Sequence, residues 1–260
     1  MNATGGISPA KAPYRCITRQ LILSRDDRPF ASEINTRPLP APPSRMTRAG
    51  QLCEPGNPPL VQMHREHSSQ NNRRLHNPKK YLNRTFIRLS EPSLARFALA
   101  QELIRSGNNL RDLGHTLVVS FKGRPFWEVD SKYKKNIIYH MYHLKDHGIE
   151  IALDDYNIQQ EALTRFNTLN LFNYIKVSIS SLGQCLKLNS EPEFLNRLHD
   201  HMATLTHNNK ISFIADRVEH IESHSLARAL PFAYFQGSYY SPADHLQPDF
   251  GDYFRRETWK

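Results

Sequence analysis

From Tyr81 onward the sequence alternates short apolar runs with longer amphipathic stretches, and this alternation constrains the fold most strongly. Short apolar runs fit buried strands, and stretches with apolar residues every three or four positions fit helices that pack on one face. Repeated strand–helix units are typical of a parallel sheet, either open or closed into a barrel, and periodicity alone does not separate the two. The expected strands cover residues 117–121, 149–153, 174–178 and 211–215, and the expected helices cover 131–147, 162–169, 191–208 and 223–230.

Polar residues stand at the carboxyl ends of these expected strands. They are Asp154 with Asp155, Lys176, Asp216 and Gln236. Barrel enzymes and open α/β sheets gather their chemistry at this edge. Taken singly, the aspartates fit a turn or a helix cap and Lys176 fits a solvated strand end. Their shared position predicts that they line one site.

The length of 260 residues suits a single (β/α) barrel. Residues 38–80 interrupt it, since they hold eight of the 17 prolines and hardly any periodic apolar pattern. Such a segment cannot bury enough apolar surface to offset its ordering entropy, so we expect it to be mobile. The expected organisation is a flexible N-terminus over 1–14, one domain over 15–250 and a C-terminal tail over 251–260.

The net charge of +9 arises in the N-terminal part, which has 18 basic and 8 acidic residues up to position 112, against 16 and 17 after it. Because no aromatic residues interleave with these charges as in a single-strand-binding groove, the pattern does not predict a nucleic-acid partner. The three cysteines show no paired spacing, and no run of about 18 apolar residues exists. A cytoplasmic protein without membrane insertion is expected.

Four stretches resemble the motifs of the EAL family of cyclic-di-GMP phosphodiesterases. Residues 148–156 (GIEIALDDY) with 171–177 (LFNYIKV) resemble GxxIALDDF and YxKID, 214–219 (IADRVE) resembles AEGVE, and 236–242 (QGSYYSP) resembles QGYxxSxP. A weaker match, 33–37 (EINTR), resembles the signature strand EALxR. The resemblance implies a TIM-barrel-like α/β fold with one antiparallel strand and a substrate that lies across the C-terminal mouth.

The family reaction is thought to use two Mg²⁺ or Mn²⁺ ions, which require a ring of oxygen ligands. The resemblance places Glu33, Asp154 and Asp155 in that ring, with Asp216 as a shortened ligand. It also retains Lys176 and Glu219. Three further ligand positions fall on residues that do not fit, namely Arg88, Val118 and Ser178. We therefore expect neither a metal cofactor nor catalysis, and interpret the chain as a degenerate family member.

Three functions stay open at this point. The first is a non-catalytic bacterial regulator of motility or adhesion that acts through a protein partner such as a transcriptional regulator, as degenerate relatives do. The second is a cyclic-di-GMP receptor that uses Arg37, Asp155 and Gln236. Its binding is expected to be weak or absent, because Asn157-Ile158-Gln159 replaces the family's Gly-Thr-Gly loop. The third is a residual Mg²⁺- or Mn²⁺-dependent phosphodiesterase that releases pGpG.

Overall fold

The computed structural model of the chain describes residues 15–38, 83–89, 91–122, 131–156, 170–188 and 193–246. The expected N-terminal segment 1–14, the proline-rich segment beyond Pro38, the helix around 162–169 and the tail 251–260 lie outside the described residues. Pro38, the first residue of the expected mobile segment, is the last residue of a strand.

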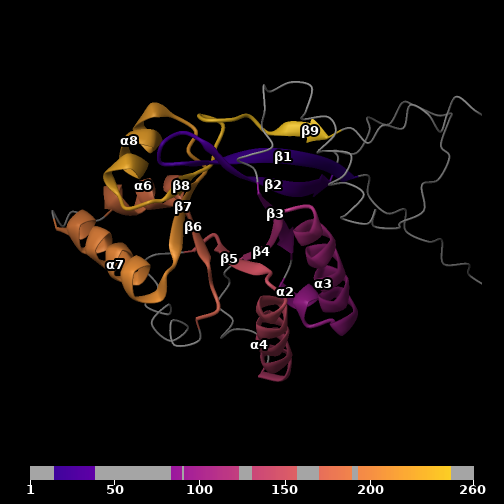
Figure 1. Cartoon of the computed structure of the whole chain (residues 1–260). Helices are drawn as coiled ribbons and strands as arrows, with labels where there is room; N and C mark the ends of the chain where they lie inside the picture. The colour runs from indigo at the N-terminus through magenta and orange to yellow at the C-terminus, as the bar shows by residue number, and fades with distance from the viewer. Residues whose placement is uncertain are drawn as a thin grey trace, which may run out of the picture.

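Eight strands close into a barrel, so the structure decides between the two arrangements that the periodicity left open. The order is β2-β3-β4-β5-β6-β7-β8-β1, and β1 pairs with β2 to close the ring, while β9 adds to β1. Figure 1 shows β1 and β2 as a long pair of strands between β3 and β8. The strands are β1 (Arg15–Ser24), β2 (Pro29–Pro38), β3 (Arg84–Leu89), β4 (Thr116–Lys122), β5 (Glu150–Asp154), β6 (Tyr174–Ser178), β7 (Ser212–Asp216), β8 (Tyr234–Phe235) and β9 (Asp244–Leu246).

One barrel strand runs against the others, as the resemblance implied. The neighbouring pairs from β2 to β8 are all parallel, and β1 is antiparallel to β2, β8 and β9. A hairpin of four residues joins β1 to β2, which antiparallel strands allow and parallel strands do not. The prediction of an α/β barrel with one antiparallel strand is confirmed.

The helices cover the outside of the barrel (Figure 1). The longer helices bury an apolar stripe against it. Ile137, Met141 and Leu144 of α4 are fully buried, and Leu198 and Met202 of α7 face inward in the same way. The described helices are α2 (Glu91–Leu94), α3 (Phe97–Asp112), α4 (Ser131–Asp146), α6 (Ile179–Leu188), α7 (Phe194–Asn209) and α8 (Ile221–Ala229). The expected helices over 131–147, 191–208 and 223–230 correspond to α4, α7 and α8 within about three residues at each end.

A second apolar layer fills the inside of the barrel, separate from the layer under the helices. It consists of Ile22, Ala31, Phe86, Val118, Ala152, Tyr174 and Ile214. Because successive strand residues point to opposite faces, the interior residues of each strand are two positions apart. This layer is packed solid, as in other closed eight-stranded barrels, and therefore separates the two ends of the barrel interior.

The lower end of the interior, where the parallel strands begin, is closed by aromatic rings and one ion pair, which we call the base cluster: Phe30, Arg84, Glu150, Tyr174 and Tyr234. Arg84 donates two hydrogen bonds to the Glu150 carboxylate, at 2.9 and 3.2 Å, and the Tyr174 hydroxyl donates a third at 2.8 Å. Phe30 stacks on Tyr234 at 3.7 Å between centroids and lies 5.1 Å from the Arg84 guanidinium carbon. The cluster closes the barrel with its polar groups paired.

Candidate functional site at the barrel mouth

The polar residues of the mouth follow from the strand period. Each lies on the same face as an interior apolar residue, two positions closer to the carboxyl end of its parallel strand. Glu33 follows Ala31 in β2, Asp154 follows Ala152 in β5, and Asp216 follows Ile214 in β7. The same rule places Arg88, Ser120, Lys176 and Gln236 at this level, above Phe86, Val118, Tyr174 and Tyr234. The barrel therefore brings distant sequence segments to one end.

Four of these side chains form a ring of alternating charge, which we call the mouth ring: Glu33, Lys176, Asp154 and Arg88. Lys176 Nζ lies 2.8 Å from Glu33 Oε1 and 4.0 Å from Asp154 Oδ1. Arg88 Nη2 contacts Asp154 Oδ2 directly and lies 4.0 Å from Glu33 Oε1. Each cation thus lies between both carboxylates. Glu33, Asp154 and Lys176 are completely buried, and Arg88 is 28% exposed.

The second oxygen of Glu33 is held by two amides. Gln236 Nε2 donates to Glu33 Oε2 at 2.7 Å, and Asn35 Nδ2 donates to the same atom at 3.1 Å. Gln236 is positioned by a close backbone contact, since a Cβ on the next residue, Gly237, would lie 2.0 Å from the Val218 carbonyl oxygen. Both oxygens of Glu33 therefore already accept hydrogen bonds within the protein.

The ring shifts the two carboxylic acids in opposite directions. Burial opposes ionisation of Glu33, but Lys176 and Arg88 outweigh it and lower its pKa from 4.5 to about 2. Burial dominates at Asp154 and raises its pKa, although Lys176 and Arg88 act against that rise. The pKa of Lys176 is raised, because Glu33, Asp216 and Asp154 outweigh burial, which acts to lower it. Lys176 is therefore a permanent buried cation.

Asp155 lies above the ring and is paired with two further cations. Lys122 Nζ lies 3.1 Å from Asp155 Oδ2, and Arg217 Nη2 donates to Asp155 Oδ1 at 2.9 Å. Asp155 and Arg217 both have left-handed backbones, with φ of 53° and 57°, which cost non-glycine residues about 1–2 kcal/mol each. Arg217 stands at the glycine of the family's AEGVE motif. Strain of this kind concentrates at functional sites, where the surrounding structure holds it in place.

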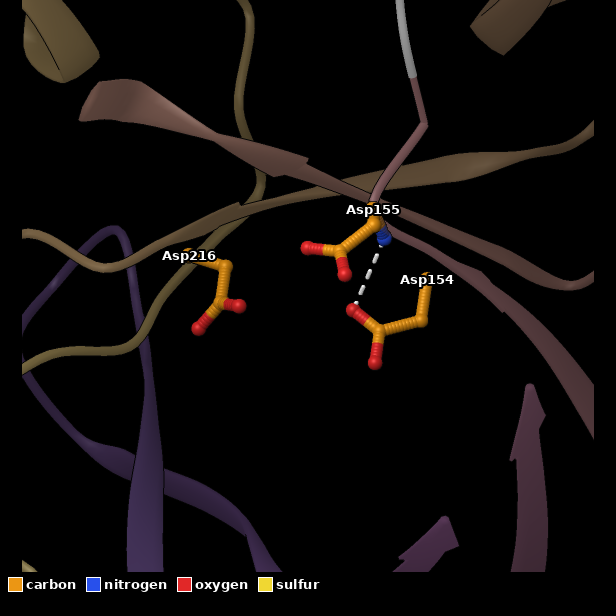
Figure 2. A group of neighbouring side chains, drawn as sticks. All are labelled: Asp154, Asp155 and Asp216. Atoms are coloured by element: carbon orange, nitrogen blue, oxygen red, sulfur yellow. Dashed lines mark hydrogen bonds between the residues drawn. The ribbon is translucent and has the colours of Figure 1, made fainter. Parts of the chain in front are cut away.

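Three carboxylates could contribute to a cation site. Asp154, Asp155 and Asp216 each offer an oxygen within 4.8 Å of the others, and the Asp155 backbone amide donates to Asp154 Oδ1 at 2.9 Å. Figure 2 shows the three side chains turned toward a common space. Asp154 and Asp155, however, each have two basic partners. The residues present do not fit the two-cation centre that the resemblance implies.

The structure changes which β4 residue counts as the missing ligand. Val118 pairs with Phe86 and Glu150 along the sheet and lies in the interior apolar layer. Ser120 is level with Arg88 and completely buried, and its Oγ has no hydrogen-bond partner among the described residues. The mouth position is therefore Ser120, not Val118. Neither residue supplies a carboxylate.

The remaining expected residues divide between the mouth and its surroundings. Ser178 is buried, is level with Asp216, and has its Oγ 3.3 Å from Ser181 Oγ. Glu219 is exposed, and none of the ion pairs between described side chains includes it. Arg37 lies in β2, but its side chain falls outside the described part of the chain.

Sequence reasoning missed four mouth residues: Asn35, Ser120, Lys122 and Arg217. Counting two positions at a time along each expected strand would have found Ser120 and Lys122. Arg217 carried a signal too, since it replaces a family glycine. Asn35 carried the same signal, since it stands two positions after Glu33 in the expected signature strand and donates to it.

The fold and mouth define a closed α/β barrel with one antiparallel strand and a C-terminal end at which acidic and basic side chains are paired. The EAL domain family profile matches residues 58–243, so the chain belongs to the EAL domain family. Glu33 and both strands that close the barrel precede the matched range. No curated protein matches the sequence.

Solved structures share this fold at low identity. They include the EAL enzyme Bd1971 with cAMP and cyclic-di-GMP bound (14% identity, TM-score 0.59, 88% of this chain and 62% of that chain). Another is the Bacillus subtilis YkuI protein in complex with substrate c-di-GMP and calcium (15% identity, TM-score 0.58, 91% of this chain and 57% of that chain). A third is the Pseudomonas aeruginosa FimX EAL domain bound to c-di-GMP (20% identity, TM-score 0.57, 88% of this chain and 90% of that chain). This chain spans about three fifths of the first two. No helix among the described residues is long and apolar enough to cross a membrane.

Proposed function

We propose that this EAL domain does not hydrolyse cyclic-di-GMP and acts by binding another protein. The observation that carries the proposal is the charge pairing at the mouth. Four carboxylates, Glu33, Asp154, Asp155 and Asp216, share the described mouth with four basic groups, Arg88, Lys122, Lys176 and Arg217. The site is thus neutral overall without any added cation.

Metal-assisted hydrolysis requires cations that polarise the phosphate and generate a hydroxide. A cation about 4 Å from the Arg88 guanidinium would be repelled by about 4 kcal/mol at an effective dielectric constant near 20 for each unit of its charge. It would also have to displace Arg88 from Asp154. The basic residues of the mouth therefore hold its carboxylates in place and oppose binding of the cations that the reaction needs.

The test is turnover of cyclic-di-GMP by the purified chain with Mg²⁺ or Mn²⁺. We expect a rate equal to that of a buffer control. Metal-dependent release of pGpG that disappears in Asp154→Ala would contradict the proposal and would identify the chain as a phosphodiesterase.

The resemblance to degenerate family members supports a role in bacterial signalling, in the control of motility or adhesion, with a transcriptional regulator as the kind of partner. The odd number of cysteines, which show no paired spacing in the sequence, supports a cytoplasmic location. If the role is contact with a protein, an Asp155→Asn variant expressed in the host strain that lacks the gene should restore the motility or adhesion phenotype. A phosphodiesterase would lose its function with this change, because Asp155 belongs to the paired aspartates of the family motif.

A cyclic-di-GMP receptor is the second candidate. The Bd1971 and FimX structures have this nucleotide bound, and half-exposed Lys122 and Arg217 stand at the rim of the mouth, where phosphates could approach. Gln236, however, is buried and already donates to Glu33. We expect calorimetry to give a dissociation constant weaker than about 10 μM, which corresponds to less than about 7 kcal/mol of binding. Submicromolar binding that is lost in Arg37→Ala would favour the receptor.

A further inference from the structure

The mouth ring has the arrangement of a cation site with a side chain in the place of the ion. Arg88 contacts Asp154 and lies 4.0 Å from Glu33, so its guanidinium lies between two carboxylates that are otherwise completely buried. The neighbouring strand brings Ser120 level with it, and there a buried hydroxyl has no hydrogen-bond partner among the described residues. A guanidinium and a small buried hydroxyl therefore stand side by side on adjacent strands, at the level of the two carboxylates.

We propose that Arg88 is the resident counter-cation of this site, and that replacing it with oxygen ligands turns the mouth into a site for a divalent cation. This inference rests on the proposed non-catalytic function. In the present chain, the guanidinium supplies the charge that keeps Glu33 and Asp154 together, so the barrel mouth does not depend on a metal for its geometry.

The physical reason lies in the cost of leaving a buried carboxylate without a counter-charge. Asp154 is completely buried, and its two oxygens face Arg88 and Lys176 separately. If Lys176 were the one remaining cation, it would mainly neutralise Glu33, because its Nζ lies 2.8 Å from Glu33 Oε1 and 4.0 Å from Asp154 Oδ1. Without Arg88, Asp154 therefore has a surplus of negative charge that a hard divalent ion with oxygen ligands would offset.

The experiment uses the double variant R88N/S120E, which removes the guanidinium and adds an amide and a carboxylate at the same level. Thermal unfolding and calorimetry with Mn²⁺ alone are the measurements, so no nucleotide or turnover enters. We expect Mn²⁺ to raise the melting temperature of the variant by about 5–10 °C at a concentration about 100-fold above its dissociation constant. The wild-type chain should show no such rise and no saturable binding.

Two single variants are the matched controls. S120E keeps Arg88, so its new carboxylate should pair with the guanidinium and give no response to Mn²⁺. R84N removes another arginine of the same strand that also pairs with a carboxylate, Glu150, at the opposite end of the barrel. It should lower the melting temperature without creating a response. A response in S120E or R84N equal to that of the double variant would overturn the proposal.

R88N alone keeps the inference testable if the double variant does not fold. Recovery of either variant by Mn²⁺ during refolding supports the proposal. If both stay unfolded with and without Mn²⁺, or the double variant folds and binds no Mn²⁺, a divalent ion does not replace the guanidinium and the inference is overturned. These outcomes differ from failure of the proposed function, which appears as cyclic-di-GMP turnover by the wild-type chain.

Discussion

The two ends of the barrel interior bury charge in different ways. At the base, one ion pair between Arg84 and Glu150 is partly exposed and is surrounded by aromatic rings. At the mouth, two carboxylates and Lys176 are completely buried and connected in a ring with Arg88. Seven interior apolar residues, including one that also belongs to the base cluster, occupy the space between these two ends.

This difference indicates that the two ends have different roles: the base closes the barrel, and the mouth keeps a functional site. The base resembles an ordinary structural ion pair, in which three hydrogen bonds satisfy one carboxylate at the edge of solvent. Buried ion pairs are weak evidence for stability, since apolar residues of similar volume often stabilise a protein equally well. Keeping four acids and four bases at the mouth, with two strained backbones, is therefore better explained by function than by stability.

The largest expected effect is at the centre of the mouth ring. Lys176→Met should lower the free energy of unfolding by about 3–5 kcal/mol, because among the described groups it leaves Arg88 as the one cation in contact with the two buried carboxylates, Glu33 and Asp154. Urea unfolding measures the change. Lys176→Met/Glu33→Gln is the control, and it should recover part of the loss. A loss below about 1 kcal/mol in the single variant would remove the distinction between mouth and base.

The fall in stability at acid pH should depend on Glu33, a carboxylic acid of the mouth ring. Since the folded pKa of Glu33 is about 2 against an ordinary value of 4.5, its contribution of about 3 kcal/mol is complete above pH 4.5 and is lost as the pH falls toward 2. Glu33→Gln should therefore flatten the fall in stability over this range, as measured by urea unfolding at successive pH values.

Asp154→Asn is the matched control for that titration. Burial raises the pKa of Asp154, so its contribution has the opposite sign and is lost as the pH rises. The acid fall in this variant should be at least as steep as in the wild-type chain. If both variants flattened the fall in stability equally, the ring would not shift the pKa values of Glu33 and Asp154 in opposite directions.

At the base, Arg84→Ala should cost about 1–3 kcal/mol, less than Lys176→Met, because Glu150 keeps the Tyr174 hydroxyl as a donor and has access to water. Arg84→Lys should lose less than Arg84→Ala, since it keeps the charge but not the two parallel hydrogen bonds. Thermal unfolding compares the two variants. A cost for Arg84→Ala above that of Lys176→Met would reverse the comparison between the ends.

The smallest expected effect concerns the strained loop above the mouth. Arg217→Gly and Arg217→Ala both remove the partly exposed pair with Asp155, which contributes about 0–1 kcal/mol. Only glycine also relieves the backbone at φ 57°. We expect the glycine variant to be more stable than the alanine variant by about 1 kcal/mol in urea unfolding. Equal stability would show that the backbone stores no strain there.

The fold class and most of the mouth residues could be predicted from sequence patterns. Apolar periodicity predicted four parallel strands to within about a residue, and the family motifs predicted closure with one antiparallel strand. The polar strand ends at Asp154, Lys176, Asp216 and Gln236 could be found because parallel strands end at one edge. These are local signals, which a single chain segment carries within a few residues.

Which of these charges are in contact depends on the assembled barrel. The register between β3 and β4 placed Ser120 rather than Val118 beside Arg88, because a shift of two residues moves a side chain from the mouth into the apolar layer. The pairings of Arg88 with Asp154, and of Lys122 and Arg217 with Asp155, join segments up to 66 residues apart. No local pattern encodes them, since they form only when the barrel closes and brings the strand ends together.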